Sequence, residues 1–118
     1  MGSRAKATGS GERLKTPWFH ILLALADGAQ HGYAIRRSVK DRTDGAVKLY
    51  PATLYGSIRD LSEQGLIEAL DGDADPDDDQ RRRYYRLTPD GRDALAEEVA
   101  RLQAILDEAR ATRALSGA

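Results

Sequence analysis

The segment PATLYGSIRDLSEQGLI, residues 51–67, decides which fold this sequence adopts. Pro51 favours the first turn of a helix, and the pattern predicts that this helix continues to about Gln64 and stops at Gly65. Its apolar side chains recur at helical spacing and predict a buried face of Leu54, Ile58 and Leu61. The opposite face carries Ala52, Gly56, Arg59 and Glu63, flanked by Thr53 and Tyr55. Such a helix fits a recognition helix that enters a DNA groove, although an ordinary amphipathic surface helix would look similar.

Two further helices are predicted before this segment. Thr16 and Pro17 have the residue types of an N-cap and a first helical position, and the helix is expected from Pro17 to Asp27. Apolar residues surround this helix, so it needs two burial partners, its own domain and a second subunit. A second helix is expected from about His31 to Arg42. Its solvent-facing side carries basic residues, namely Arg36, Arg37, Lys40 and Arg42.

The C-terminal half predicts a hairpin and a long helix. Residues 66–70 and 82–87 are expected to pair as two strands around an acidic tip at 71–80. Thr88 and Pro89 repeat the cap-plus-proline pattern and start a helix that runs to about Arg113. The predicted fold class is therefore mainly α with a small two-stranded β-hairpin, a winged helix-turn-helix followed by a long C-terminal helix. We expect residues 1–15 to be a flexible N-terminal arm or an expression remnant, 16–88 the winged helix-turn-helix domain, 89–114 a dimerisation helix and 115–118 a flexible tail.

The long helix carries a heptad pattern. Leu95, Val99, Leu102, Leu106 and Ala109 follow steps of four, three, four and three residues. A chain of 118 residues forms one small domain that cannot bury this whole seam, so a second copy is expected to cover it. The predicted dimer interface consists of Trp18, Leu22, Leu95, Val99, Leu102 and Leu106.

Composition excludes several functional classes. The chain has no Cys, which removes disulfides, Cys-ligated zinc and thiol catalysis and fits a reducing, cytoplasmic setting. The longest apolar run, residues 21–26, is too short to span a bilayer, so no membrane partner is expected. The net charge of −1 hides segregation, because residues 71–80 hold six Asp and residues 81–86 hold four Arg.

The sequence offers little for catalysis or metal binding. The two histidines, His20 and His31, belong to no triad spacing, and no phosphate-binding glycine loop is present, so no enzyme activity is expected. Asp71, Asp73 and Asp75 match the start of a calcium loop, but Pro76 stands where a Gly is needed and Arg82 where the bidentate Glu is needed. We therefore expect no metal and no cofactor, and a solvated acidic loop.

Basic residues point to DNA. Arg82 and Arg83 lie next to tyrosines in the predicted wing, an arrangement that suits contact with the DNA backbone, although strand alternation would turn some of these side chains inward. Thr53 and Tyr55 suit phosphate oxygens, and Arg59 can reach a base edge or a phosphate. Together with the second helix, the residues so far predicted to contact DNA are Arg36, Arg37, Ala52, Thr53, Tyr55, Gly56, Arg59, Arg82 and Arg83.

Three spaced motifs resemble the PadR family of transcriptional regulators. They are ILLALADGAQHGY at 21–33, PATLY with LSEQGLI at 51–55 and 61–67, and RYYRLTPDG at 83–91. The resemblance covers residues 16 to 110 and implies a winged helix and a homodimeric DNA-binding repressor of the smaller subfamily, with one C-terminal helix. It adds Tyr33 to the DNA-binding set. Ala52, where the family often has Gly or Ser, and the acidic wing loop depart from the pattern.

The resemblance also implies an effector, because some relatives bind phenolic acids or flat hydrophobic drugs near the dimer interface. Trp18 and Phe19 are the candidate effector-binding residues, although aromatics in an apolar helix are more often core. The predicted function is a homodimeric transcriptional repressor of a pseudo-palindromic operator in double-stranded DNA, released by a small hydrophobic or aromatic effector. The alternative is a winged-helix protein–protein interaction module without specific DNA binding.

Overall fold

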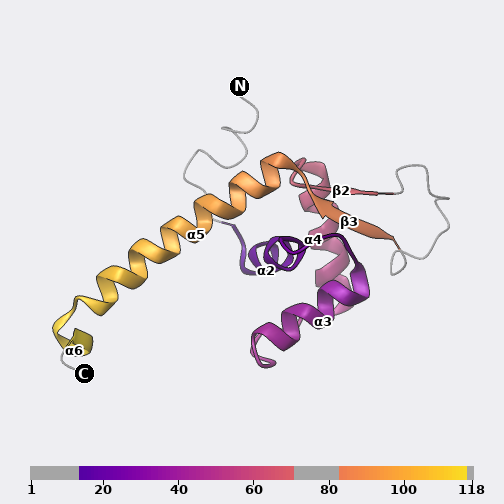
Figure 1. Ribbon diagram of the computed structural model, residues 1–118. Helices are drawn as coiled ribbons and strands as arrows, with labels where there is room; N and C mark the ends of the chain where they lie inside the picture. The colour runs from indigo at the N-terminus through magenta and orange to yellow at the C-terminus, as the bar shows by residue number, and fades with distance from the viewer. Residues whose placement is uncertain (1–13, 71–82, 117–118) are drawn as a thin grey trace.

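The computed structural model describes residues 14–70 and 83–116, and Figure 1 shows how their elements are arranged. The helices are α2 (Thr16–Leu25), α3 (Gly32–Arg42), α4 (Pro51–Glu63), α5 (Pro89–Arg110) and α6 (Arg113–Ser116). The strands are β1 (Gln30–His31), β2 (Ile67–Ala69) and β3 (Tyr84–Leu87). The order of elements confirms the predicted winged helix with a long C-terminal helix.

The sheet has three strands where two were expected. β2 and β3 form the predicted antiparallel hairpin, with Glu68 opposite Arg86. β1 adds to the other side of β3, with Gln30 opposite Tyr85 and His31 opposite Tyr84. A two-residue strand is too short to produce an alternating pattern, so β1 was not predicted, and the structure places His31 in this strand and not in the following helix.

Three helix starts show how local chemistry sets the boundaries. Thr88 caps α5 as predicted, because its hydroxyl oxygen accepts a hydrogen bond from the Gly91 amide at 3.0 Å. His31 caps α3, where its Nδ1 accepts from the Ala34 amide at 3.1 Å. The predicted Thr16 cap is wrong: Thr16 is already helical, and Lys15 occupies the cap position without a side-chain hydrogen bond.

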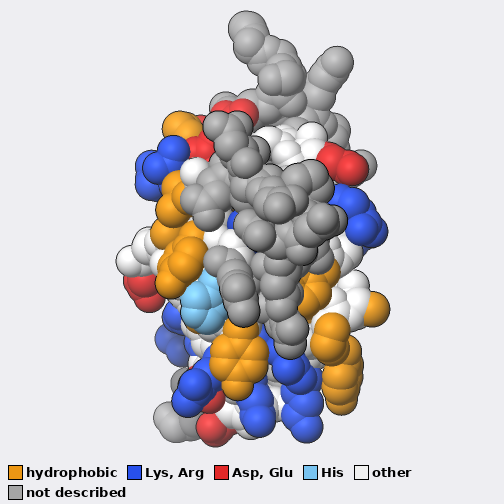
Figure 2. Space-filling view, turned by 90° about the vertical axis from the view of Figure 1, so that its right-hand side faces the viewer, with side chains coloured by type: hydrophobic (Ala, Val, Ile, Leu, Met, Phe, Trp, Pro, Cys, Tyr) orange, Lys and Arg blue, Asp and Glu red, His pale blue; other side chains and the backbone are white. Residues whose placement is uncertain are grey.

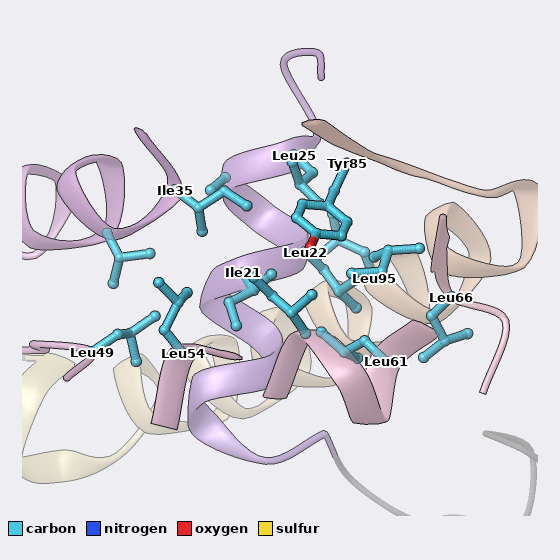
Figure 3. Close-up of a cluster of buried hydrophobic side chains, with 14 of the residues drawn as sticks. Ile21, Leu22, Leu25, Ile35, Leu49, Leu54, Leu61, Leu66, Tyr85 and Leu95 are labelled. Carbon is cyan, nitrogen blue, oxygen red and sulfur yellow. The ribbon is translucent and has the colours of Figure 1, made fainter. Parts of the chain in front are cut away.

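The core is built around α2 (Figure 3). Ile21, Leu22 and Leu25 of this helix are enclosed by side chains from α3, α4, the sheet and the start of α5. The predicted core face of α4 is confirmed, since Leu54, Ile58 and Leu61 are all buried. Each such aliphatic side chain contributes about 1.5–3 kcal/mol when fully removed from water, so this cluster is the main source of stability of the domain.

The two ends of α5 have different surroundings. Near its start, Ala94 and Leu95 are buried in the core, whereas the later turns extend away from the other elements (Figure 1). The helix ends at Arg110 and a separate turn, α6, follows, so it is a little shorter than the predicted helix to Arg113. In the described part of the chain, no helix has the length and apolar character needed to cross a membrane.

Candidate nucleic-acid interface

The face of α4 that points away from the core is exposed and carries mostly small side chains. We call it the open face of α4. Ala52, Thr53 and Arg59 are exposed, while the buried residues of the same helix hold it against the core. Gly56 lies between them, and a Cβ added there would meet only the Arg59 guanidinium, at 3.8 Å. Small side chains in the middle of the face allow a close approach to another surface, and Arg59 adds one cation at its edge.

A basic groove lies along α3 and extends to Tyr50, the N-cap of α4. It has a volume of about 660 Å³ and is lined by α3 and by the segment that leads into α4, namely by Tyr33, Arg36, Arg37, Lys40, Asp41, Lys48, Leu49 and Tyr50. Figure 2 shows Lys and Arg side chains gathered at the end of the molecule where Figure 1 places α3. Four cations and one carboxylate in one groove produce a local positive field although the whole chain is slightly negative.

The structure separates the predicted DNA-binding residues of α3 and α4 into two groups. Tyr33, Arg36 and Arg37 are exposed and lie together at the groove. Ala52, Thr53 and Arg59 are exposed on α4 and form the other group. Tyr55 differs, because its ring is half-buried and packs against the core. Lys40, Lys48 and Tyr50 complete the groove but were missing from the prediction. Lys40 and Lys48 were visible as basic residues, but nothing in the sequence indicated that the segment before α4 folds back beside α3.

The arginines of the wing differ in their surroundings. The Arg86 Nε donates to Glu68 on the neighbouring strand at 2.7 Å, and this exposed cross-strand pair is worth little to stability. Arg83 is half-buried, and its Nε is enclosed without a hydrogen-bond partner among the described residues. Burial raises the pKa of the Tyr85 hydroxyl, and the Arg83 charge opposes that rise. Arg82 and the acidic loop at 71–80 lie outside the described residues.

The predicted dimer interface is divided by the fold. Leu22 has no exposed surface, so it belongs to the core of the single chain, which corrects its assignment to an interface, and Leu95 is 8% exposed. In contrast, Val99, Leu102 and Leu106 of α5 are 38–46% exposed. Ile105, 49% exposed, extends the same apolar surface and was missed because the heptad count followed only one seam. We call Val99, Leu102, Ile105 and Leu106 the distal apolar face.

The candidate effector residues lie at the N-terminal end of α2. Trp18 and Phe19 are half-buried and pack against the core, and the Lys15 ammonium lies 4.8 Å from the centre of the Trp18 ring. The Phe19 ring meets His20 edge to face. Burial, together with the charge of Arg42, lowers the pKa of His20.

Within residues 14–70 and 83–116, no cluster of His, Asp or Glu side chains is arranged to hold a metal ion.

The helices, the small sheet and the exposed helix beside a basic groove are those of a winged-helix transcriptional regulator. The chain belongs to the PadR-like family of transcriptional regulators, whose model matches residues 21–97. It is 32% identical over 93 residues to the transcriptional regulator Rv3488 of Mycobacterium tuberculosis, a match that spans 75% of this chain and 78% of the relative.

Two solved structures are similar to this fold. A transcriptional regulator from Clostridium thermocellum has a TM-score of 0.65 at 26% identity, with 80% of this chain and 86% of that chain covered. A structure described as the mechanism for regulation of DNA binding of Bordetella bronchiseptica BpsR by 6-hydroxynicotinic acid has a TM-score of 0.62 at 27% identity, over 88% of this chain and 72% of that one. The family and these neighbours are regulators and not enzymes.

Proposed function

We propose that this protein binds double-stranded DNA with the open face of α4 in the major groove and the basic groove of α3 on the adjacent backbone. The observation that carries this proposal is the gathering of Arg36, Arg37, Lys40 and Lys48 in one groove that extends to Tyr50, the N-cap of α4. Arg59 would read a base edge, Thr53 would contact a phosphate oxygen, and the cations of the groove would neutralise phosphates. Arg82 and Arg83 remain proposed wing contacts.

The DNA-binding form is proposed to be a homodimer. The distal apolar face leaves four large apolar side chains exposed on one helix, and a second copy would cover them about a two-fold axis. Trp18, half-buried in α2, stays in the proposed interface. Two copies present two α4 helices, which matches a pseudo-palindromic operator read as two half-sites.

Repression released by a small ligand completes the proposed function. BpsR, a structural neighbour, has its DNA binding regulated by 6-hydroxynicotinic acid, a small aromatic acid. The half-buried Trp18 and Phe19 offer aromatic surface for an effector of similar size and hydrophobic or aromatic character. Occupancy of the operator in the absence of effector would block transcription.

A protein–protein interaction module without DNA binding is the second candidate, and the net charge of −1 with an exposed apolar helix favours it. The test selects duplexes from a random-sequence pool with the purified full chain and measures their affinity against a scrambled duplex at several salt concentrations. For the DNA-binding function we expect a selected palindromic sequence and an affinity that falls steeply with salt, because each neutralised phosphate releases a counterion. Equal, weak binding to both duplexes would favour the interaction module.

A further inference from the structure

The start of α3 and the second turn of α4 meet at an unusually close contact. Gly32, the first residue of α3, is buried, and a Cβ built on it would lie 2.9 Å from both Cε1 and the hydroxyl oxygen of Tyr55 and 3.2 Å from Cζ. The hydroxyl end of the Tyr55 ring therefore sits directly against the backbone of Gly32. Carbon atoms do not normally approach so closely, so any side chain at position 32 would displace the ring or the helix.

The backbone gives no separate reason for glycine at this position. Gly28, Gly45 and Gly65 have a positive φ, but Gly32 does not and begins a regular helix. Within a helix alanine is favoured over glycine by about 1 kcal/mol. The close approach of Tyr55 is thus the feature that a side chain at position 32 would disturb.

The same contact lies where the sheet joins the helices. His31, the residue before Gly32, pairs with Tyr84 through β1 and β3, which fixes the start of α3 from the side of the sheet. Tyr55 also lies near the buried Tyr85 of β3, since its hydroxyl contributes to raising the Tyr85 pKa. The start of α3 is therefore held between the sheet and a side chain of α4.

We propose that Tyr55 is a positioning residue for DNA recognition. Its ring sets the distance between the start of α3 and α4, and so places the cations of the basic groove relative to Arg59 on the α4 face. This inference rests on the proposed DNA-binding function, and it replaces the expectation that the Tyr55 hydroxyl contacts a phosphate. A phosphate contact needs only the hydroxyl, whereas positioning needs the space between Gly32 and the second turn of α4 to be filled without overlap.

Three variants separate these two roles: Gly32→Ala, Tyr55→Phe and the pair Gly32→Ala with Tyr55→Leu. Gly32→Ala forces the ring away and should weaken binding about tenfold, a size typical of coupled neighbouring residues. Tyr55→Phe keeps the whole ring and loses only the hydroxyl, so it should bind within about twofold of the original protein with an unchanged salt dependence. In the double variant the shorter leucine side chain does not reach position 32, so the alanine Cβ fits there. The affinity should then recover above that of Gly32→Ala.

The affinities are measured with a duplex selected by the unmodified protein and with a scrambled duplex, at several salt concentrations, after circular dichroism has established folding. Weaker binding by Tyr55→Phe with a shallower salt dependence would overturn positioning in favour of a phosphate contact. If Gly32→Ala does not fold, the Tyr55→Phe measurement alone decides between the two roles. Full affinity of a folded Gly32→Ala, or no recovery in the double variant, would also overturn it. If the unmodified protein does not prefer the selected duplex over the scrambled one, the proposed DNA-binding function is rejected, and so is this inference, which rests on it.

Discussion

The body of the molecule and the distal part of α5 contain similar apolar side chains in opposite surroundings. In the body, from α2 to the start of α5, large aliphatic residues such as Ile21, Leu54 and Leu61 are at most 2% exposed. On the distal apolar face the exposure of Leu102 is 38% and that of Ile105 is 49%. The body is closed by its own chain, whereas the distal helix presents a surface that gains from burial against another molecule.

Mutations in the two regions should therefore change different properties of the protein. A change inside the body alters the free energy of unfolding of the single chain. A change on the distal apolar face leaves the core intact and alters association. Because the proposed operator contact uses two copies of α4, both kinds of change reach DNA binding, but by different routes that separate measurements can distinguish.

The largest effect is expected from Leu102→Asp. The substitution places a charge in the proposed dimer interface, at a cost on the order of several kcal/mol. We expect light scattering to show a monomer and gel shifts to show loss of DNA binding, while circular dichroism stays that of a folded protein. Ala104→Asp adds the same charge to an exposed position on the other side of α5 and should leave the dimer intact. A dimeric Leu102→Asp protein would show that the interface lies elsewhere.

The junction between the two regions is tested by Gly91→Ala. Gly91 lies in the first turn of α5, and a Cβ there would lie 1.9 Å from the Leu66 carbonyl oxygen, a backbone atom that cannot move aside alone. Forcing the contact should lower the free energy of unfolding by about 1–3 kcal/mol, the usual cost of overpacking. Chemical denaturation measures it.

A matched glycine provides the control for the junction. Gly56→Ala places a Cβ in nearly open space within α4 and should instead raise stability by up to about 1 kcal/mol through helix propensity. Equal stability of the two alanine variants would mean that α5 does not pack on the body as described.

The proposed reading surface of the body is tested by Arg59→Ala. Arg59 is exposed at the edge of the open α4 face, and its loss should cost about 1–3 kcal/mol of affinity if it reads a base, with relaxed specificity at one position. A smaller loss that is equal for all sequences would identify a phosphate contact. Arg92→Ala removes an exposed arginine from α5 and serves as the control. Unchanged affinity of Arg59→Ala for the selected duplex would reject this face of α4.

The smallest effect is expected inside the body, from the titration of His20. Burial, and then the charge of Arg42, lowers the pKa of His20 below its ordinary value of 6.5, so the folded state favours the neutral ring. The contribution of neutral His20 to the free energy of unfolding is therefore complete above about pH 6.5. It is lost as the pH falls from there through the lower pKa of the folded state, because the unfolded chain binds the proton more readily.

Thermal melting between about pH 7.5 and pH 5 measures this dependence, since the unperturbed histidine titrates in that range. His20→Gln should flatten the decline in the melting temperature, and Arg42→Gln should reduce it partly. A decline of the same size in His20→Gln would assign the pH dependence to other groups.

Much of the fold could be predicted from the sequence because its elements carry strong local patterns. Leu54, Ile58 and Leu61 define the core face of α4 by spacing alone, and Thr88 with Pro89 marks the start of α5 by residue type. β1 was not predictable, since two residues carry no periodicity and its pairing with β3 joins segments that are far apart in the chain.

The candidate site was predictable only in part. The exposed residues of α4 and the arginines of α3 follow from helix geometry. The packing of Tyr55 does not, because helical spacing places it at the edge of the exposed face, whereas the structure places its ring against Gly32 and the core. The pairing of Arg86 with Glu68 likewise depends on the strand register and not on either residue.

The sequence by itself determined the order of the main helices and of the hairpin, the family motifs and the two faces of α4, since these depend on residue types at short spacings. The tertiary structure alone decided that Leu22 lies inside the chain while Leu102 lies outside it, although both belong to apolar helical patterns. The physical reason is that helical periodicity says which residues share a face but not what the face packs against. That depends on how the rest of the chain surrounds α2 and where α5 leaves the body.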